Sequence, residues 1–215
     1  MKPNPPSSVR MFDDHADEFD TRYRRHEPYL QTYEELGRYL PQDQKLSVLD
    51  IACGPAHAVR TLMDKGFDLE VLGIDLSSNM LEAAGKNVPS GNFKLLDARN
   101  IDQLDGPFDL ILCGFCIPYL PPIECIKLIS DLSSLLTPGG CSYLSAIEGE
   151  TYLKKENATP SGDPYFVHHY PVNTLESAFA ESNLQVLNLE RKPIVTHDGS
   201  VDNELFFYLK RGPHA

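Results

Sequence analysis

Carboxylates follow several apolar runs of this chain, at points where the strands of a parallel sheet would end. In LDIACGPAHAV, residues 49–59, an apolar run reaches Asp50 and continues into small residues around Gly54 and then into a predicted helix. Asp75 follows VLGI, 21 residues after Gly54, and Asp97 lies 22 residues further on. In an open α/β sheet, ligands bind at the carboxyl ends of the strands. An acidic group about 20 residues after such a turn can accept hydrogen bonds from ribose hydroxyls, so the spacing indicates a nucleoside site.

The turn at residues 52–57 departs from the dinucleotide-binding pattern G-x-G-x-x-G. It reads A-C-G-P-A-H and contains one glycine. Binding of a pyrophosphate requires close approach of the backbone and open amides at a helix start. Pro55 has no backbone N–H, and the methyl groups of Ala52 and Ala56 narrow the approach. The turn therefore favours a nucleoside without a pyrophosphate.

An alternation of strands and helices must position these residues. Short apolar runs predict five strands, over 45–52, 69–75, 92–98, 107–115 and 141–147. Helical segments are expected between most of them, over 56–65, 77–87 and from Pro121 or Pro122 to 136. Strands alternating with helices imply a parallel sheet with right-handed crossovers.

The C-terminal part leaves that alternation. We expect a helix over 173–183 and then two strands, 184–191 and 203–211, without a helix between them. Such a hairpin makes one strand antiparallel. The predicted fold is α/β, a Rossmann-like seven-stranded mixed sheet flanked by helices, with a small insert after the fifth strand. The insert is polar and contains prolines and a glycine, which is typical of a mobile lid.

The N-terminal residues are expected to form an arm and a helical flap. Residues 1–10 contain three prolines and predict a loose arm. Apolar residues recur every three or four positions from Phe12 to Tyr23, which predicts one helix with an apolar face. A second helix is expected from Pro28 to about residue 40. The predicted organisation is a single structural domain, divided into the flap at 1–42 and the main part at 43–215, with the insert at 148–172.

The composition favours a small-molecule ligand. The chain has 215 residues, 19 basic and 31 acidic side chains, and a net charge near −12, which disfavours nucleic acid and anionic membranes as partners. No segment reaches the roughly 18 apolar residues of a membrane span. Five cysteines, most of them within apolar runs, indicate reduced thiols in a cytoplasmic protein. Cys113 and Cys116 have no second pair, so no metal is expected. The chain is expected to be a monomer or a homodimer.

Five segments in order, VLDIACGPA, GIDLSSNML, LLDARN, FDLILCGF and LTPGG, resemble the class I S-adenosylmethionine-dependent methyltransferases. The opening FDDHADEFDTRY resembles the N-terminal helix of their small-molecule branch, which includes the quinone-ring methyltransferases. The resemblance covers about residues 11–210. It implies S-adenosylmethionine as cofactor and transfer of its sulfonium methyl group to an O, N or C atom of a small acceptor. Ala52 and Ala56 depart from the pattern, because they replace glycines.

The resemblance also implies roles for matching residues at the methionine end of the cofactor. Asp50 and Gly54 are expected beside the methionine part, and the backbone at Cys113 near its amino group. Tyr23 of the flap is expected to reach the cofactor or to close over the acceptor.

At the nucleoside end, the resemblance implies that Asp75 holds the ribose and that Leu76 lies against the adenine. Asp97 is expected to accept from the adenine amino group, with the Ala98 backbone on a ring nitrogen. The complete set of expected cofactor residues is Tyr23, Asp50, Ala52, Gly54, Asp75, Leu76, Met80, Asp97, Ala98 and Cys113.

Candidates on the acceptor side come from three later segments. Tyr119 follows the fourth strand and Glu148 the fifth, where each is either a substrate contact or an ordinary packing or solvated residue. In YFVHHYP, His168 or His169 could act as a general base near neutral pH, or could be an ordinary surface or core histidine. Adjacent side chains of an extended segment point to opposite sides, so at most one is expected in a site. Tyr170 of the same stretch is a further candidate for substrate contact.

Two alternatives remain from the sequence. One is an NAD(P)-dependent oxidoreductase on a similar sheet, which the missing glycines and the terminal hairpin disfavour. The other is a non-catalytic S-adenosylmethionine-binding protein.

Overall fold

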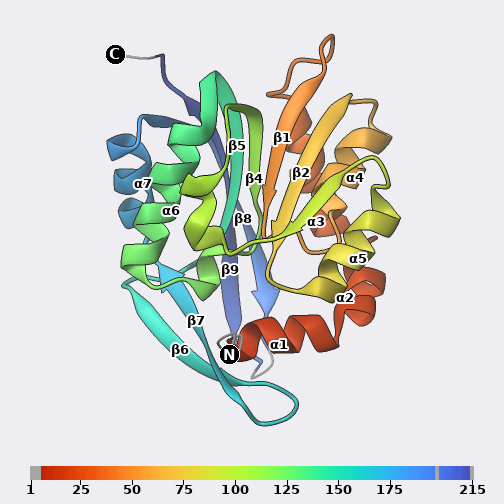
Figure 1. Cartoon of the computed structure of the whole chain (residues 1–215). Coiled ribbons are helices and arrows are strands. Elements are labelled where there is room, and N and C mark those ends of the chain that lie inside the picture. The colour runs from red at the N-terminus through yellow and green to blue at the C-terminus, as the bar shows by residue number, and fades with distance from the viewer. Residues whose placement is uncertain (1–5, 197–198, 214–215) are drawn as a thin grey trace.

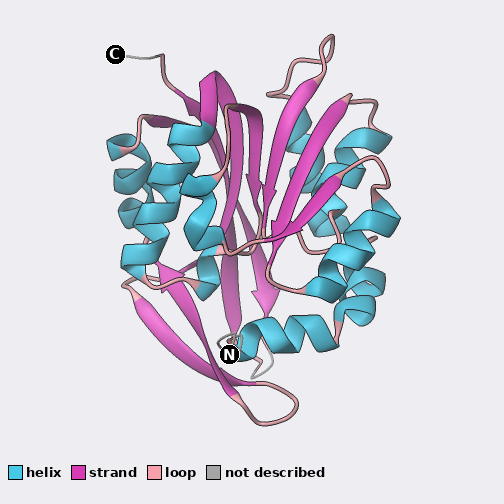
Figure 2. Ribbon diagram, in the orientation of Figure 1, coloured by secondary structure: helices cyan, strands magenta, loops and turns pink. Residues whose placement is uncertain are grey.

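Short apolar runs form the centre of the sheet and are buried on both faces. The computed structural model describes residues 6–196 and 199–213 (Figure 1). In β1, neighbouring side chains point to opposite faces, so that Val48 and Leu49 join different core clusters. Helices therefore have to cover both faces, as Figure 2 shows. The five parallel strands are β1 (Leu46–Ile51), β2 (Leu69–Asp75), β3 (Asn92–Leu95), β4 (Phe108–Cys113) and β5 (Leu136–Glu148).

The predicted seven-stranded mixed sheet is confirmed. The hairpin of β8 (Leu184–Val195) and β9 (Val201–Arg211) completes it, and β9 runs antiparallel between β5 and β8. The seven strands follow the order β3-β2-β1-β4-β5-β9-β8. The strand order reverses between β1 and β4, which is where ligands bind in such sheets.

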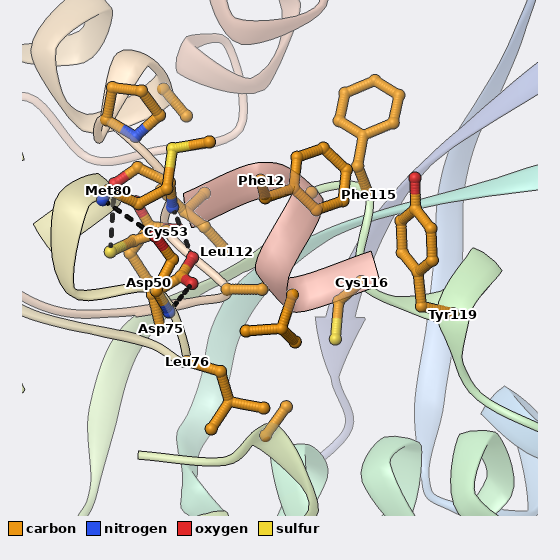
Figure 3. A pocket seen from close by; sticks show the side chains of 18 of the residues that line it. Phe12, Asp50, Cys53, Asp75, Leu76, Met80, Leu112, Phe115, Cys116 and Tyr119 are labelled. Carbon is orange, nitrogen blue, oxygen red and sulfur yellow. Dashed lines mark hydrogen bonds between the residues drawn. The ribbon is translucent and has the colours of Figure 1, made fainter. Parts of the chain in front are cut away.

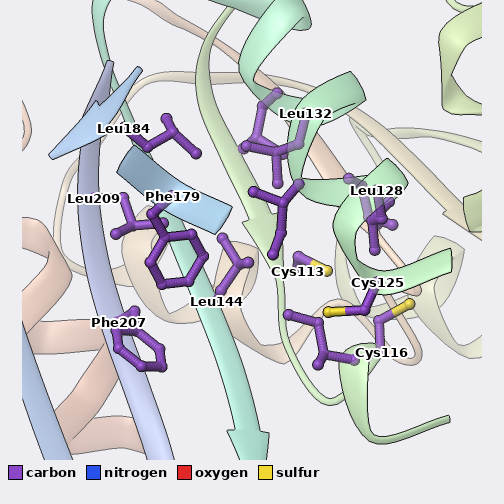
Figure 4. Packing of buried hydrophobic residues seen from close by; sticks show 14 of the residues in the cluster. Cys113, Cys116, Cys125, Leu128, Leu132, Leu144, Phe179, Leu184, Phe207 and Leu209 are labelled. Carbon is purple, nitrogen blue, oxygen red and sulfur yellow. The ribbon is translucent and has the colours of Figure 1, made fainter. Parts of the chain in front are cut away.

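Two groups of helices cover the two faces (Figure 1). On one face lie α3 (Glu27–Gly37), α4 (His57–Asp64) and α5 (Ser78–Asn87), and on the other α6 (Pro122–Leu135) and α7 (Val172–Glu181). Figure 4 shows the second core, where Leu128 and Leu132 of α6 and Phe179 of α7 lie over Leu144 and Phe207. Two 3₁₀ segments, η1 (Ala98–Gln103) and η2 (Ile117–Tyr119), follow β3 and β4. No helix in the described ranges is long and apolar enough to cross a membrane.

The insert forms regular structure, and its role as a mobile lid stays a prediction. It forms a hairpin of β6 (Leu153–Ala158) and β7 (Pro164–Tyr170), and β7 extends the sheet beside the end of β5. The proline and glycine residues form the tight turn of this hairpin. There the Gly162 N–H donates to Thr159 O at 2.8 Å, and the Asp163 N–H donates to Thr159 Oγ1 at 3.0 Å. The described sheet therefore has nine strands.

The flap contains two helices where one was predicted. They are α1 (Ser7–Asp14) and α2 (Ala16–Tyr23), and they meet at His15, whose φ of −117° and ψ of 21° leave the helical region. The His15 ring closes the end of α1, because its Nδ1 lies 2.9 Å from Met11 O. The prediction of a loose arm over residues 1–10 is wrong from Ser7 onward, and residues 1–5 lie outside the described residues.

Candidate functional site

A cavity of about 240 Å³ opens at the carboxyl ends of β1, β2 and β4, beneath the flap helices α1 and α2. Its two halves differ in chemistry (Figure 3). Carboxylates, small residues and Met80 gather at the ends of β1 and β2, whereas Phe12, Phe115 and Tyr119 gather beside β4. Nine of the ten predicted cofactor residues line this cavity: Tyr23, Asp50, Ala52, Gly54, Asp75, Leu76, Met80, Asp97 and Ala98.

The turn between β1 and α4 passes three times through the left-handed region. Ala52, Gly54 and Ala56 have φ values of 52°, 49° and 59°. For an alanine this conformation costs roughly 1–2 kcal/mol, because Cβ approaches the following carbonyl oxygen. Glycine avoids this cost because it has no Cβ. The two alanines therefore strain the backbone of the turn, in addition to narrowing the approach to it. The turn stores strain at the edge of the cavity.

Asp75 connects this turn to the end of β2. Its Oδ2 accepts the Gly54 N–H at 2.9 Å, and its Oδ1 accepts the Ser77 N–H at 2.9 Å. Ser77 in turn caps α5, because its Oγ accepts the Met80 N–H at 3.0 Å. Burial raises the pKa of Asp75, although the two backbone donors act in the opposite direction. Each carboxylate oxygen keeps a lone pair for a further donor.

Asp50 lies at the end of β1 and is 4% exposed. Its Oδ2 has no hydrogen-bond partner in the described part of the chain. Burial, together with the nearby charge of Asp75, raises the pKa of Asp50 to about 8. A buried carboxylate without a partner suits a cation or a hydrogen-bond donor that a ligand brings.

Asp97 is shared with a neighbouring side chain. Although burial opposes it, the hydrogen bonds from Arg99 hold the pKa of Asp97 below its usual value. The Arg99 Nε lies 2.9 Å and 3.0 Å from the two carboxylate oxygens, and the Arg99 N–H also donates to Oδ1. A ligand amino group at Asp97 therefore has to use the lone pairs that Arg99 leaves.

Two carboxylates fix the flap over the cavity. Asp13 of α1 accepts from Ser77 Oγ at 2.7 Å and from the Asn79 N–H at 3.0 Å. Asp20 of α2 accepts from Asn87 Nδ2 at 2.9 Å and lies 2.7 Å from the His57 ring nitrogen. Ser77, Asn79 and His57 lie at the starts of α5 and α4, which border the cavity, whereas Asn87 is the last residue of α5. The flap position therefore depends on the same helices as the turn.

The other half of the cavity is aromatic. Phe12 meets Tyr119 edge to face at a centroid distance of 5.4 Å, and Tyr29 lies 4.8 Å from Phe115. Phe115 also has a positive φ of 58°, and its N–H donates to Ser145 Oγ. Sequence reasoning included Tyr119 as a substrate contact, placed Phe115 at a strand end without a role, and missed Tyr29. Phe115 lies two residues after β4, and this position was the available signal.

Five other predicted site residues do not line the cavity. The Cys113 side chain points into the core with Cys116 and Cys125 (Figure 4), and Cys116 instead lines the cavity. Glu148 Oε1 accepts from Arg191 Nε at 3.0 Å, and its Oε2 accepts from Asn203 at 3.0 Å.

The histidine pair and Tyr170 lie in β7, on the hairpin that the sequence did not predict. His168 Nδ1 lies 2.7 Å from the Tyr152 hydroxyl, and His169 Nδ1 lies 3.3 Å from Glu148 O. The Tyr170 hydroxyl donates to Leu120 O. β7 runs beside the cavity, because the Tyr165 ring lies 6.5 Å from that of Tyr119. The side chains of His168, His169 and Tyr170 nevertheless do not line it, since their polar groups are engaged with the contacts above.

Comparisons with known proteins agree with this fold. Residues 48–140 match the family model described as a methyltransferase domain. Trans-aconitate 2-methyltransferase of Variovorax paradoxus is 31% identical over 119 residues, which are 55% of this chain and 45% of that protein. Demethylmenaquinone methyltransferase of Thermotoga maritima is 43% identical over 68 residues, 32% of this chain and 30% of that protein. The matched segments thus span about half or less of these relatives.

Two solved structures show how far the fold extends. The 1,6-didemethyltoxoflavin-N1-methyltransferase of Burkholderia thailandensis, solved with S-adenosylhomocysteine, has a TM-score of 0.69 at 15% identity and covers 99% of this chain and 92% of that one. The [4+2]-cyclase SpnF has a TM-score of 0.74 at 12% identity, with 99% of each chain covered. The sheet order, the cavity and the domain match define a methyltransferase-type domain. Over residues 48–140 the chain is similar to this family of methyltransferase domains, in agreement with its resemblance to the class I S-adenosylmethionine-dependent methyltransferases.

We expect Ala52→Gly to stabilise the protein. Glycine removes the strain of the left-handed alanine, which stabilises the folded state. It also gives the unfolded chain more backbone freedom, which offsets part of this effect. The expected net gain in the free energy of unfolding is about 0.5–1 kcal/mol. Urea unfolding without ligand measures it. The matched control is Ala180→Gly in α7, which is exposed and helical and which predicts a loss of about 0.5–1 kcal/mol. A loss of similar size in both variants would contradict the strain at Ala52.

We expect Asp50→Asn to change how stability depends on pH. The folded state keeps the Asp50 proton up to about pH 8, whereas the unfolded chain loses it near pH 4. The wild-type protein therefore loses stability as pH rises between these values, and the variant lacks that loss. Between pH 5 and pH 8, the unfolding free energy of Asp50→Asn should rise relative to that of the wild-type protein by roughly 2–4 kcal/mol. Glu204, whose pKa is raised to about 7 by burial, is present in both proteins and cancels. A difference that does not vary with pH would refute the ionisation argument.

Proposed function

We propose that this protein transfers the methyl group of S-adenosylmethionine to an O, N or C atom of a small-molecule acceptor. The observation that carries the proposal is one cavity in which the carboxylates of β1 and β2 lie next to an aromatic half. This division provides separate places for a polar cofactor and for an acceptor, side by side.

The residues at the first half fit the nucleoside part of the cofactor. Asp75 has lone pairs left for the two ribose hydroxyls. Leu76, Met80 and Ala98 line the same half and offer an apolar surface to the adenine. Asp97 is partly engaged by Arg99, so the amino group of the adenine is expected to share that carboxylate.

The methionine part carries an amino group, a carboxylate and a sulfonium. Asp50 offers its unpartnered oxygen to a positive group. His57 and Ala58 line the cavity at the start of α4, where the helix dipole and the free backbone N–H groups favour a carboxylate. The aromatic faces of Tyr23 and Tyr29 suit the sulfonium charge.

When bound, S-adenosylmethionine supplies an activated methyl carbon on a positively charged sulfur. The tasks left to this chain are to align the acceptor atom with that carbon and to exclude water. Alignment of this kind can supply roughly 7–11 kcal/mol of the barrier. The flap and the aromatic half serve both tasks, because they surround the acceptor side and cover it from solvent. A mechanism based on alignment also needs no conspicuous set of catalytic residues.

The other activities considered have less support. An NAD(P)-dependent oxidoreductase would need room for a pyrophosphate, but the turn presents Pro55 and two left-handed alanines there. The relatives are named for different acceptors, trans-aconitate and demethylmenaquinone, so their names do not identify the acceptor of this chain. Single-turnover methyl transfer to any acceptor distinguishes an enzyme from a protein that only binds the cofactor.

Calorimetry tests the cofactor directly. We expect S-adenosylmethionine and S-adenosylhomocysteine to bind, and NAD and NADP to give no heat. Asp75→Ala should weaken binding by roughly 2–4 kcal/mol, because it leaves ribose hydroxyls without their charged acceptor. The variant also loses the acceptors of two backbone N–H groups, so its stability should fall as well.

Asp109→Ala is the matched control for Asp75→Ala. Asp109 also accepts a backbone N–H, from Ser47 at 3.0 Å. This contact lies at the amino ends of β1 and β4, whereas the cavity lies at their carboxyl ends. The control variant should lose stability and keep its affinity for the cofactor. Equal affinity in both variants would remove Asp75 from the binding site, and tight binding of NAD would refute the proposed function.

The flap gives a further prediction. A protein that lacks residues 1–26 should keep the circular dichroism of the sheet, because α1 has no fully buried residue and α2 buries only Ala16. It should lose most turnover and bind S-adenosylhomocysteine at least about tenfold more weakly, since about 1.4 kcal/mol of contacts suffices for that loss. Thermal melting of the truncated protein is the check: unfolding would make the flap part of the core, and full affinity with full activity would remove it from the mechanism.

A further inference from the structure

The aromatic half of the cavity has the shape and chemistry of a site for a flat ring. Its walls come from three separate parts of the chain: Phe12 from α1, Tyr29 from α3, and Phe115 and Tyr119 from the segment after β4. Phe12 stands at 88° to Tyr119, and the Tyr29 and Phe115 rings are tilted by 46°. Rings at such angles present both faces and edges, which planar aromatic molecules contact favourably.

Charge on the cavity wall disfavours an anionic acceptor. Among the described residues that line the cavity, the acidic side chains are Asp50, Asp75, Asp97 and Glu124, and the basic ones are Arg99 and His57. Arg99 holds Asp97 and lies 3.7 Å from Glu124. The His57 ring is engaged with Asp20, and burial lowers its pKa. A buried carboxylate of an acceptor would therefore lack a cation among these groups, at a high desolvation cost.

One polar group in the aromatic half selects for a hydrogen-bond donor. The Tyr29 hydroxyl donates to Glu204 Oε1 at 2.9 Å, and Glu204 is 6% exposed on β9. With its proton engaged, the Tyr29 oxygen can only accept. Lys192 lies opposite Glu204 in the β8–β9 register, but its ammonium lies 3.5 Å from Glu190, so the charge behind Tyr29 remains acidic.

We propose that the acceptor is a planar, uncharged ring compound that carries an O–H or N–H group, and that polycarboxylates are excluded from this site. The proposal rests on the proposed function and names its acceptor class. The ring would lie among Phe12, Phe115 and Tyr119, and its O–H or N–H group would donate to the Tyr29 hydroxyl oxygen.

Calorimetry with three probes tests the class of acceptor. The probes are 2-naphthol, 2-naphthoate, which has the same ring with a carboxylate, and trans-aconitate. Each is titrated into the free protein and into protein saturated with S-adenosylhomocysteine. We expect 2-naphthol to bind at least tenfold more tightly than 2-naphthoate, and trans-aconitate to give no heat.

Tyr29→Phe tests the polar contact, and Tyr39→Phe is its matched control. The Tyr39 hydroxyl also donates to a glutamate, Glu35, at 2.9 Å, but Tyr39 does not line the cavity. Tyr29→Phe should weaken 2-naphthol binding at least fivefold. Its affinity for S-adenosylhomocysteine should not change, because phenylalanine keeps the ring face and the thioether lacks the sulfonium charge. Tyr39→Phe should change neither affinity.

The outcomes separate this proposal from the proposed function. Failure of S-adenosylhomocysteine to bind overturns the proposed function, whereas the 2-naphthol titration of the free protein still reports on the ring site. No binding of 2-naphthol up to its solubility limit overturns the acceptor class. Binding of 2-naphthoate or trans-aconitate as tight as that of 2-naphthol, or equal effects of the two tyrosine variants, overturns it too.

Discussion

The site depends on one carboxylate that joins two turns. Asp75 accepts the backbone N–H of Gly54 from the first turn and that of Ser77 from the second, so its two oxygens set the distance between the ends of β1 and β2. Both donors are backbone groups, which makes the contact independent of the side chains around it. Because Ser77 also caps α5, the carboxylate fixes the start of that helix as well. A ligand that binds Asp75 therefore meets groups that are already positioned.

Backbone strain gathers around the same cavity. Three of the described non-glycine residues with positive φ, Ala52, Ala56 and Phe115, lie at or beside it, and the fourth, Asn183, lies after α7. Such conformations cost free energy and persist only where the surrounding structure holds them. Here the holding contacts are identifiable: Asp75 fixes the turn of the alanines, and Ser145 accepts the Phe115 N–H. The cavity edge is consequently pre-organised at the expense of local stability.

The sequence predicted those parts of the fold that follow from local pattern. Apolar runs predicted the strands, and the spacing of Asp75 from Gly54 reflected the length of one strand–helix–strand unit. Most of the residues predicted to bind the cofactor therefore line the cavity. The aromatic half was not predicted as a whole, because Phe12, Tyr29 and Phe115 come together only through tertiary packing of α1, α3 and β4. The histidines failed for a related reason. The polar pattern of the insert hid a hairpin, and strand pairing with β5, which decides where His169 points, has no local signature.

The flap connects the two halves of the cavity through shared partners. Asp13 reaches Ser77 and Asn79 at the start of α5, the helix whose cap is tied to Asp75. Phe12, the residue before Asp13, places its ring against Tyr119 on the aromatic side. One short helix thus touches the groups beside the proposed ribose position and the aromatic wall of the cavity at once. Any shift of α5 on cofactor binding has to move Asp13, and with it the ring of Phe12, so occupation of the first half bears directly on the shape of the second.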